Sequence, residues 1–135
     1  MRDRAVLDSG VIFALYFEED ASIRAERAAS DYSPITLDLA VAEVGNAAWK
    51  RVVFFKESRD ASLRSLLSCL QFIKSCTIIN SSDLAESAYE ISLENKTTFY
   101  DSLFLAAAGQ ANAPLLTLDR KMYEAAKARN NVLML

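Results

Sequence analysis

The chain has 135 residues, of which 52% are hydrophobic and 24% charged, and its formal net charge is −3. This length and composition are typical of one compact globular domain, and we expect a single domain over residues 1–135. The sequence contains no histidine, which excludes Ser-His-Asp catalysis, Cys-His catalysis and His-ligated zinc. Its three glycines are too scattered to form a glycine-rich phosphate loop.

Strand-like and helix-like segments alternate along the chain. Runs rich in Val, Ile, Leu and Thr are typical of fully buried strands, and they occur at Ala5–Leu7, Ser33–Thr36, Thr77–Ile79, Leu115–Leu118 and Val132–Leu135. Hydrophobic residues spaced three to four positions apart predict helices, and they occur at Val11–Phe17, Ala21–Ser30, Leu39–Val52, Leu63–Ile73, the segment after Ser82, Phe99–Gln110 and Lys121–Arg129. This alternation predicts an α/β, three-layer sandwich with a central, mostly parallel five-stranded sheet and about seven helices.

Three local features refine these elements. Ser82 and Thr98 are of the residue type that caps a helix start, so each is expected to begin the helix that follows it. The stretch Val52–Phe55 is β-branched and aromatic yet lies between two helical patterns. We interpret it as the end of one helix or as the turn of a helical hairpin.

The two cysteines and the longest apolar run indicate an intracellular protein. Cys69 and Cys76 lie among apolar residues and are expected to be reduced, buried thiols. The run Val11–Phe17 is too short to cross a membrane. Acidic residues precede it and no small-residue cleavage site follows, so we expect no signal peptide and a cytoplasmic location.

Four acidic residues occupy positions that suggest a shared site. Asp8 directly follows the first predicted strand, and Asp119 follows the fourth. Asp101 lies in the first turn of a predicted helix, and Glu43 lies among apolar residues inside another. In open α/β sheets, ligands bind beyond the carboxyl ends of the strands. We therefore expect these carboxylates to gather at that edge of the sheet.

Each acid also has an ordinary structural explanation. Asp8 and Asp119 are candidates for helix caps, and Asp101 for a charge that complements a helix dipole. Glu43 is a candidate for an ion pair with Lys50. Taken together, however, clustered carboxylates repel one another unless a cation compensates them, and a site with only oxygen ligands selects a hard ion such as Mg²⁺ or Mn²⁺.

Four blocks of sequence resemble those of the PIN domain family, in that family's order and spacing. They are LDSGVIFALYF at 7–17, AEVGNAAWK at 42–50, YDSLFLAAA at 100–108 and LLTLDRKM at 115–122. Together they cover nearly the whole chain, and they are most similar to the small VapC-type toxins of toxin–antitoxin pairs. The one visible departure is Phe104, at a position where tyrosine is common in the family.

The resemblance implies roles for individual residues. Its metal-binding and catalytic acids correspond to Asp8, Glu43, Asp101 and Asp119. A supporting shell around them would contain Ser9, Asn46 and Thr117; Asn46 shares a helical face with Glu43 and could hydrogen-bond its carboxylate or a metal-bound water. Contacts to substrate phosphate are expected from Lys50 and Arg120.

The same resemblance implies an activity. The chain is expected to be an Mg²⁺- or Mn²⁺-dependent endoribonuclease in which metal-activated water hydrolyses RNA phosphodiester bonds, leaving a 5′-phosphate and a 3′-hydroxyl. Single-stranded or loop RNA is the expected substrate, because its splayed nucleotides can enter a narrow acidic pocket. The expected partners are a VapB-type antitoxin and a second copy of the chain in a homodimer.

In the complex with the antitoxin, we expect the aromatic residues of the first helix to form part of the interface. An antitoxin tail would insert apolar anchors near Phe13, Tyr16 and Phe17, and one of its basic side chains would take the place of metal among the acids. A second aromatic group comprises Trp49, Phe54 and Phe55. The alternative for either group is burial in the core.

Two other functions remain open at the level of sequence. An Mg²⁺-dependent phosphoaspartate domain also places aspartates at strand ends, but the dehalogenase type needs a second aspartate where this chain has Gly10. The receiver type needs an acidic pair near the first strand, where Asp8 has only Ser9 beside it. The third possibility is a non-catalytic PIN-like interaction module.

Overall fold

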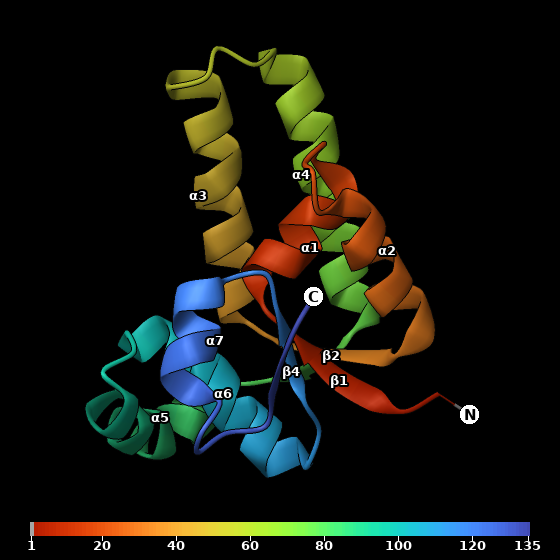
Figure 1. The fold of residues 1–135 in the computed structure, drawn as a ribbon. Helices are drawn as coiled ribbons and strands as arrows, with labels where there is room; N and C mark the ends of the chain where they lie inside the picture. The colour runs from red at the N-terminus through yellow and green to blue at the C-terminus, as the bar shows by residue number, and fades with distance from the viewer. Residues whose placement is uncertain (1) are drawn as a thin grey trace.

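The computed structural model describes residues 2–135, which form a central sheet covered by helices on both faces (Figure 1). The five strands are β1 (Arg4–Leu7), β2 (Ser33–Leu37), β3 (Thr77–Ile79), β4 (Leu115–Thr117) and β5 (Val132–Met134). The seven helices of the described residues are α1 (Ser9–Tyr16), α2 (Ser22–Asp31), α3 (Leu39–Val53), α4 (Arg59–Ser75), α5 (Ser81–Asn95), α6 (Phe99–Ala111) and α7 (Arg120–Ala126).

The sheet has the strand order β3-β2-β1-β4-β5, and every pair of neighbouring strands is parallel. All five carboxyl ends therefore lie at one edge, and the predicted sheet is confirmed. The central strand β1 pairs with β2 through Val6 and Ile35 and with β4 through Leu7 and Leu116. The residues after β1 and β4 are thus held side by side, although more than a hundred positions separate them in sequence.

Alternation along the strands divides the core into two layers. Ala5 and Leu7 of β1 pack into a cluster with buried residues of α1, α2, α3 and α4. Val6, between them, packs on the opposite face with buried residues of α5, α6 and α7. Because successive side chains of a strand point to opposite faces, one apolar run serves both layers. The three-layer arrangement expected from the sequence is confirmed.

The predicted elements are all present, with bounds that differ by a few residues at either end. The helix predicted over Lys121–Arg129, for example, spans Arg120–Ala126. Helix α1 begins at Ser9 because the Asp8 carboxylate accepts a hydrogen bond from the Val11 amide at 3.0 Å and so caps the helix. Helix α5 begins at Ser81, so the prediction that Ser82 caps it is wrong. The backbone N–H and hydroxyl of Ser81 both donate to Asp38 at the end of β2, which satisfies the first turn from outside the helix.

Helices α3 and α4 form a hairpin that rises above the sheet (Figure 1). Helix α3 ends at Val53 and Phe54 and Phe55 form the turn, as interpreted from the sequence. The two helices are joined where Ser62 of α4 donates a buried hydrogen bond to the carbonyl oxygen of Ala48. The first half of α3, on one side of this hairpin, borders the acid site at the carboxyl ends of the strands.

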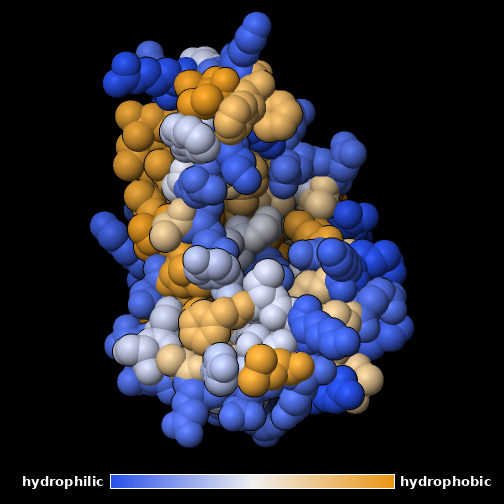
Figure 2. Space-filling model, turned by 90° about the vertical axis from the view of Figure 1, so that its left-hand side faces the viewer, coloured by the Kyte–Doolittle hydropathy of each residue, from blue (hydrophilic) through white to orange (hydrophobic). Residues whose placement is uncertain are grey.

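The two aromatic groups have opposite environments. Phe13 and Phe17 are only 8% and 2% exposed, and their rings stack 4.0 Å apart. The expectation that Phe13 and Phe17 anchor a partner is therefore wrong: they lie four residues apart on the side of α1 that faces the core, whereas Tyr16 is exposed. The second group is exposed. Figure 2 shows apolar side chains gathered over the upper part of the molecule, where α3 and the turn after it lie, and the exposed residues there include Trp49, Val53, Phe54 and Phe55.

Both cysteines are buried and free, as expected. Within residues 2–135, no helix combines the length and the apolar character needed to cross a membrane.

Candidate active site

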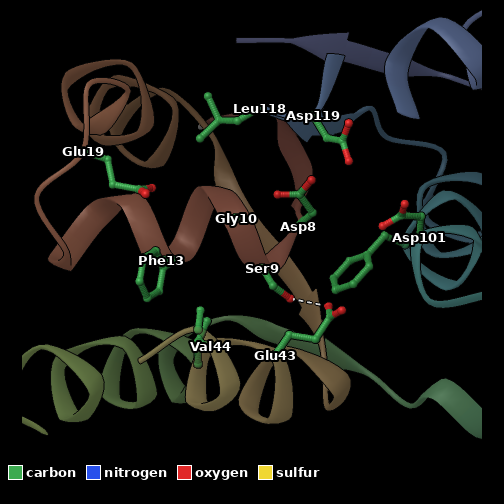
Figure 3. A pocket seen from close by; sticks show the side chains of 12 residues that line it. Asp8, Ser9, Gly10, Phe13, Glu19, Glu43, Val44, Asp101, Leu118 and Asp119 are labelled. Atoms are coloured by element: carbon green, nitrogen blue, oxygen red, sulfur yellow. Dashed lines mark hydrogen bonds between the residues drawn. The ribbon is translucent and has the colours of Figure 1, made fainter. Parts of the chain in front are cut away.

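A pocket of about 470 Å³ opens at the carboxyl ends of β1 and β4. Its lining includes Asp8, Glu43, Asp101 and Asp119. Figure 3 shows Asp8, Asp101 and Asp119 near one another at one end of the pocket, with Glu43 on α3 below them. The structure thus brings together all four acids that the sequence singled out. Among the described residues, no lysine or arginine lines the pocket, and none of these four carboxylates forms an ion pair.

Asp8 is held by two hydrogen bonds on opposite oxygens. Oδ1 accepts from the backbone N–H of Val11, and Oδ2 accepts from the hydroxyl of Thr117 at 2.5 Å. Burial raises the pKa of the Asp8 carboxyl to about 6; these two hydrogen bonds oppose the rise, and the nearby charges of Asp101 and Glu43 add to it. The carboxylate is therefore fixed in place but costly to ionise.

Glu43 reaches the pocket from the second turn of α3. Its Oε1 accepts a hydrogen bond from the Ser9 hydroxyl at 2.7 Å, the dashed line in Figure 3. Burial raises the pKa of Glu43, the Ser9 hydrogen bond lowers it, and the charge of Asp101 raises it again. Ser9 begins α1 and Glu43 belongs to α3, so this bond ties two helices together at the mouth of the site.

Asp101 and Asp119 complete the acidic wall from the other layer. Thr98 caps α6 by accepting from the Asp101 backbone N–H, which places the Asp101 side chain in the first helical turn. Burial raises the pKa of Asp101, and the charge of Asp119 adds to the rise. Asp119 caps α7 by accepting from the Met122 N–H at 3.0 Å. Two of the acids, Asp8 and Asp119, therefore have both the capping role and the pocket position considered for them.

The residues predicted to support the acids lie in two different places. Ser9 and Thr117 are hydrogen-bonded to Glu43 and Asp8, and Thr117 also accepts from the Asp119 N–H. Asn46 and Lys50 instead line a neighbouring recess, and within residues 2–135 the Asn46 side chain makes no hydrogen bond to Glu43. Arg120 lies on the surface at the start of α7 and pairs with Glu124 at 3.6 Å.

Comparison with known proteins identifies the fold. Residues 5–128 match the model of the PIN domain. This chain belongs to the PIN domain family. It is 34% identical over 122 residues to Ribonuclease VapC3 of Pyrobaculum aerophilum, an alignment that covers 90% of this chain and 93% of that protein.

Solved PIN structures agree with the assignment. A toxin–antitoxin complex from Klebsiella pneumoniae contains a chain that matches 96% of this one, with a TM-score of 0.71 and 20% identity, over 95% of its own length. VapC20 of Mycobacterium tuberculosis, described as a sarcin-ricin loop cleaving toxin, matches 90% of this chain and 95% of its own, with a TM-score of 0.68 and 15% identity. At these identities the likeness shows the shared fold. Because the chain belongs to the PIN family, it is not a phosphoaspartate domain, and that alternative is dropped.

Ribonucleases with a PIN domain generally depend on a divalent metal, and the side chains that line the pocket are of a kind that binds such an ion. Its donors are carboxylate and hydroxyl oxygens, which suit a hard cation. No three His, Cys, Asp or Glu side chains of residues 2–135 converge closely enough to hold one ion between them. Mg²⁺ usually takes one or two carboxylates and keeps several waters. The pocket therefore fits an ion held directly by one or two acids, with the others reaching its waters.

One acid of this PIN domain was missed by the sequence reasoning. Glu19, in the turn after α1, lines the far side of the pocket. Arg51 of α3 holds that turn, because its guanidinium lies 3.5 Å from the Glu19 carboxylate and donates to the Glu18 carbonyl oxygen. The acidic run 18–20 was a visible signal, but only the path of the turn brings one of its members to the pocket.

Proposed function

We propose that this protein is an endoribonuclease toxin of a VapBC-type toxin–antitoxin pair, dependent on Mg²⁺ with Mn²⁺ as a substitute. The observation that carries the proposal is a pocket at the carboxyl end of a PIN-domain sheet whose lining contains five carboxylates and, among the described residues, no lysine or arginine. The relationship to a protein named as a ribonuclease supports the reaction type. The reaction is hydrolysis of an RNA phosphodiester bond to a 5′-phosphate and a 3′-hydroxyl.

The residues would divide the work as follows. Asp8, Glu43, Asp101 and Asp119 would hold the divalent ion, directly or through its waters. When bound, the ion supplies charge stabilisation for the phosphate and lowers the pKa of a water. Thr117 and the Val11 amide keep the Asp8 carboxylate in a fixed position, and Ser9 does the same for Glu43. Fixed ligands need little rearrangement during reaction, which is the main source of electrostatic catalysis.

The proposed substrate is single-stranded RNA or an RNA loop. The unstacked nucleotides of single-stranded or loop RNA can enter a pocket of about 470 Å³, and sequence-specific RNA recognition mostly targets such nucleotides. A solved relative of the same fold is described as cleaving a loop. Lys50 and Arg120 flank the pocket and are proposed to contact the phosphates beside the cleaved bond.

The proposed partners are an antitoxin and a second copy of this chain. A chain of the same fold occurs in a toxin–antitoxin complex. An antitoxin would silence the enzyme most directly by placing an arginine or lysine among the pocket carboxylates, because several acids offset the cost of burying that charge. The exposed apolar side chains of α3 and the following turn leave surface for either partner.

The proposal is tested by incubating the purified chain with short single-stranded RNA of random sequence and Mg²⁺, then sequencing product ends that carry a 5′-phosphate. We expect cleavage that stops with EDTA and returns with Mn²⁺. Asp101→Asn, which keeps the size of the side chain and removes its charge, should lower turnover by at least about a hundredfold. Equal turnover by Asp101→Asn would refute the nuclease. No cleavage of any RNA by the isolated wild-type chain would favour the non-catalytic interaction module.

A further inference from the structure

A second recess adjoins the acidic pocket on the side of α3. Its volume is about 470 Å³, and it shares Glu43 and Ala47 with the acidic pocket, so the two cavities are neighbours across one turn of α3. This volume falls in the range of about 300–1,000 Å³ that is typical of small-ligand sites. The remaining polar and aromatic lining of the recess consists of Asn46, Lys50 and Tyr100. None of these side chains takes part in the hydrogen bonds that hold the acids.

Tyr100 presents an aromatic ring to this recess. The residue is 59% exposed, although it directly precedes the pocket residue Asp101. Among the described residues, its ring stacks on no other aromatic ring. An exposed ring next to a phosphodiesterase site is a platform on which a nucleobase can stack.

Lys50 and Asn46 add a charge and an amide on the same wall. They lie four residues apart on α3 and therefore on one helical face, which is also the face of Glu43. Lys50 makes no ion pair within residues 2–135, in contrast to the neighbouring Arg51, which is held by Glu19 and Glu57. The Asn46 amide likewise makes no hydrogen bond in this part of the chain. Both groups are therefore available to a ligand.

The three side chains match the parts of one nucleotide. A ring binds a base by stacking, an ammonium group binds a phosphate, and an amide both donates to and accepts from the edge of a base. A strand whose cleaved phosphate lies in the adjoining acidic pocket brings its next phosphate and its neutral base to this recess, so a single bound ribonucleotide can meet both Lys50 and Tyr100.

We propose that the recess is a subsite for the nucleotide next to the cleaved phosphate, with its base on Tyr100, its edge at Asn46 and its flanking phosphate at Lys50. This assignment rests on the proposed ribonuclease activity. It adds the path of the RNA strand beyond the acidic pocket, which runs across α3, between Glu43 and the start of α6. It predicts that cleavage depends on RNA length on one side of the cleaved bond and not on the other.

The test compares variants on RNA of different lengths. The substrates are an oligonucleotide that the wild-type chain cleaves and two versions of it, each cut back to a single nucleotide on one side of the cleaved bond. We expect one truncation to lower wild-type kcat/KM by about tenfold, through KM, because ground-state stacking is lost. Tyr100→Ala should lower kcat/KM about tenfold on the full substrate and little on that truncated one. Tyr100→Phe keeps the stacking face and should retain most of the wild-type value.

Two controls separate this effect from a structural one. Tyr89 is 58% exposed on α5 and lines neither the acidic pocket nor the recess, so Tyr89→Ala should change neither length dependence nor KM. Lys50→Gln should raise KM and weaken its salt dependence, whereas Lys74→Gln, at an exposed position on α4, should not. All variants should show melting temperatures close to the wild type.

The outcomes distinguish the subsite from the nuclease proposal. Binding is measured separately, by fluorescence anisotropy of a labelled single-stranded RNA of random sequence on the wild-type chain and on Tyr100→Ala. If the wild-type chain binds RNA without cleaving it and Tyr100→Ala weakens this binding about tenfold, the nuclease proposal fails, while the recess remains a binding site for a nucleotide. The subsite is overturned if Tyr100→Ala binds RNA and depends on its length as the wild type does. The subsite is also overturned if Tyr100→Ala binds RNA normally but binds the antitoxin more weakly, because the recess would then be a binding site for a protein partner.

Discussion

The hydroxyl of Thr117 donates a 2.5 Å hydrogen bond to Oδ2 of Asp8, although the two residues are 109 positions apart in sequence. The bond exists because β1 and β4 are neighbours in the sheet and both end at the same edge. It favours the ionised form of the one acid whose pKa burial raises most clearly, to about 6. The strand pairing of the fold thus supplies one of the two hydrogen bonds that oppose the effect of burial on the pKa of this carboxyl.

Thr117→Val should move the acid limb of the pH–rate profile to higher pH. Valine has nearly the shape of threonine but no hydroxyl, so the Asp8 carboxylate loses a donor that lowers its pKa. We expect a shift of about one pH unit and a corresponding loss of activity near pH 6, measured at limiting Mg²⁺. Thr117→Ser retains the hydroxyl and should keep the wild-type profile. An unchanged limb in the valine variant would show that Asp8 does not control it.

Asp8→Asn should stabilise the metal-free protein at neutral pH. The folded-state pKa of Asp8, about 6, lies above its ordinary value of 3.8, so the folded protein binds more protons than the unfolded chain between these pH values. Stability therefore falls as pH rises from about 4 to about 6, by at most about 3 kcal/mol for this group. Asparagine can still accept from Val11 without carrying the charge. Urea denaturation in EDTA should show a gain near pH 7 that disappears near pH 4; a gain of equal size at both would have another cause.

Divalent metal should stabilise the folded chain, and increasingly so as pH rises through about 6. Ionised carboxylates bind the cation, and the pocket gathers its acids only in the folded state. We expect the melting temperature to rise with Mg²⁺ or Mn²⁺ concentration and to return to its starting value with EDTA. Glu43→Gln should reduce the rise, while Glu90→Gln, on the exposed face of α5, should not. An identical response of both variants would place the bound metal outside the pocket.

The two aromatic groups should differ sharply in their effect on stability. Phe17→Ala removes a nearly fully buried ring that stacks on Phe13 and should cost about 3–5 kcal/mol of unfolding free energy. Phe55 is 73% exposed, and Phe55→Ala should change stability by less than about 0.5 kcal/mol. Chemical denaturation measures both. Comparable costs would mean that the turn after α3 is buried in solution, as it would be in a homodimer.

Arg51→Lys should loosen the turn between α1 and α2. The Arg51 guanidinium binds Glu57 at 3.1 Å, contacts Glu19 and lies 5.4 and 5.6 Å from the centres of the Phe13 and Phe17 rings. Lysine keeps the charge but cannot reproduce the planar, forked set of contacts. We expect a loss of about 1–2 kcal/mol and faster amide exchange in residues 18–20. Exchange that is faster throughout the chain would indicate global destabilisation instead.

The sequence was sufficient where the determining contacts are local. The strand runs, the caps at Asp8, Thr98 and Asp119, and the position of acids after strands follow from a few neighbouring residues. The sequence was insufficient where contacts between residues distant in sequence determine the local structure. Helix α5 begins at Ser81 rather than Ser82 because the carboxylate of Asp38, 43 positions away in sequence, accepts a hydrogen bond from the Ser81 backbone N–H.

The pocket lining shows the same limit. Glu19 reaches the acids because Arg51 holds the turn before α2, and Tyr100 meets Lys50 only because α3 and α6 cover neighbouring parts of the sheet edge. Phe13 and Phe17 could not be assigned to core or surface from spacing, since a helix that is apolar on most sides gives no preferred face.

Asp8 and Asp119 each accept a hydrogen bond from a backbone N–H in the first turn of the helix that they cap, Val11 in α1 and Met122 in α7. The carboxylates of Glu43 and Asp101 cap no helix within residues 2–135. A mutation of Asp8 or Asp119 to alanine or valine therefore removes a charge from the pocket and also weakens the start of a helix, at about 1 kcal/mol for a lost cap. For the proposed toxin under selection to escape toxicity, such a change at Asp119 yields a protein that is inactive and more readily degraded, whereas at Asp8 the relief of a buried charge offsets the lost cap. Full-length, stable and harmless alleles should therefore accumulate at Asp8, Glu43 and Asp101, and these alleles would still bind the proposed antitoxin without cleaving RNA.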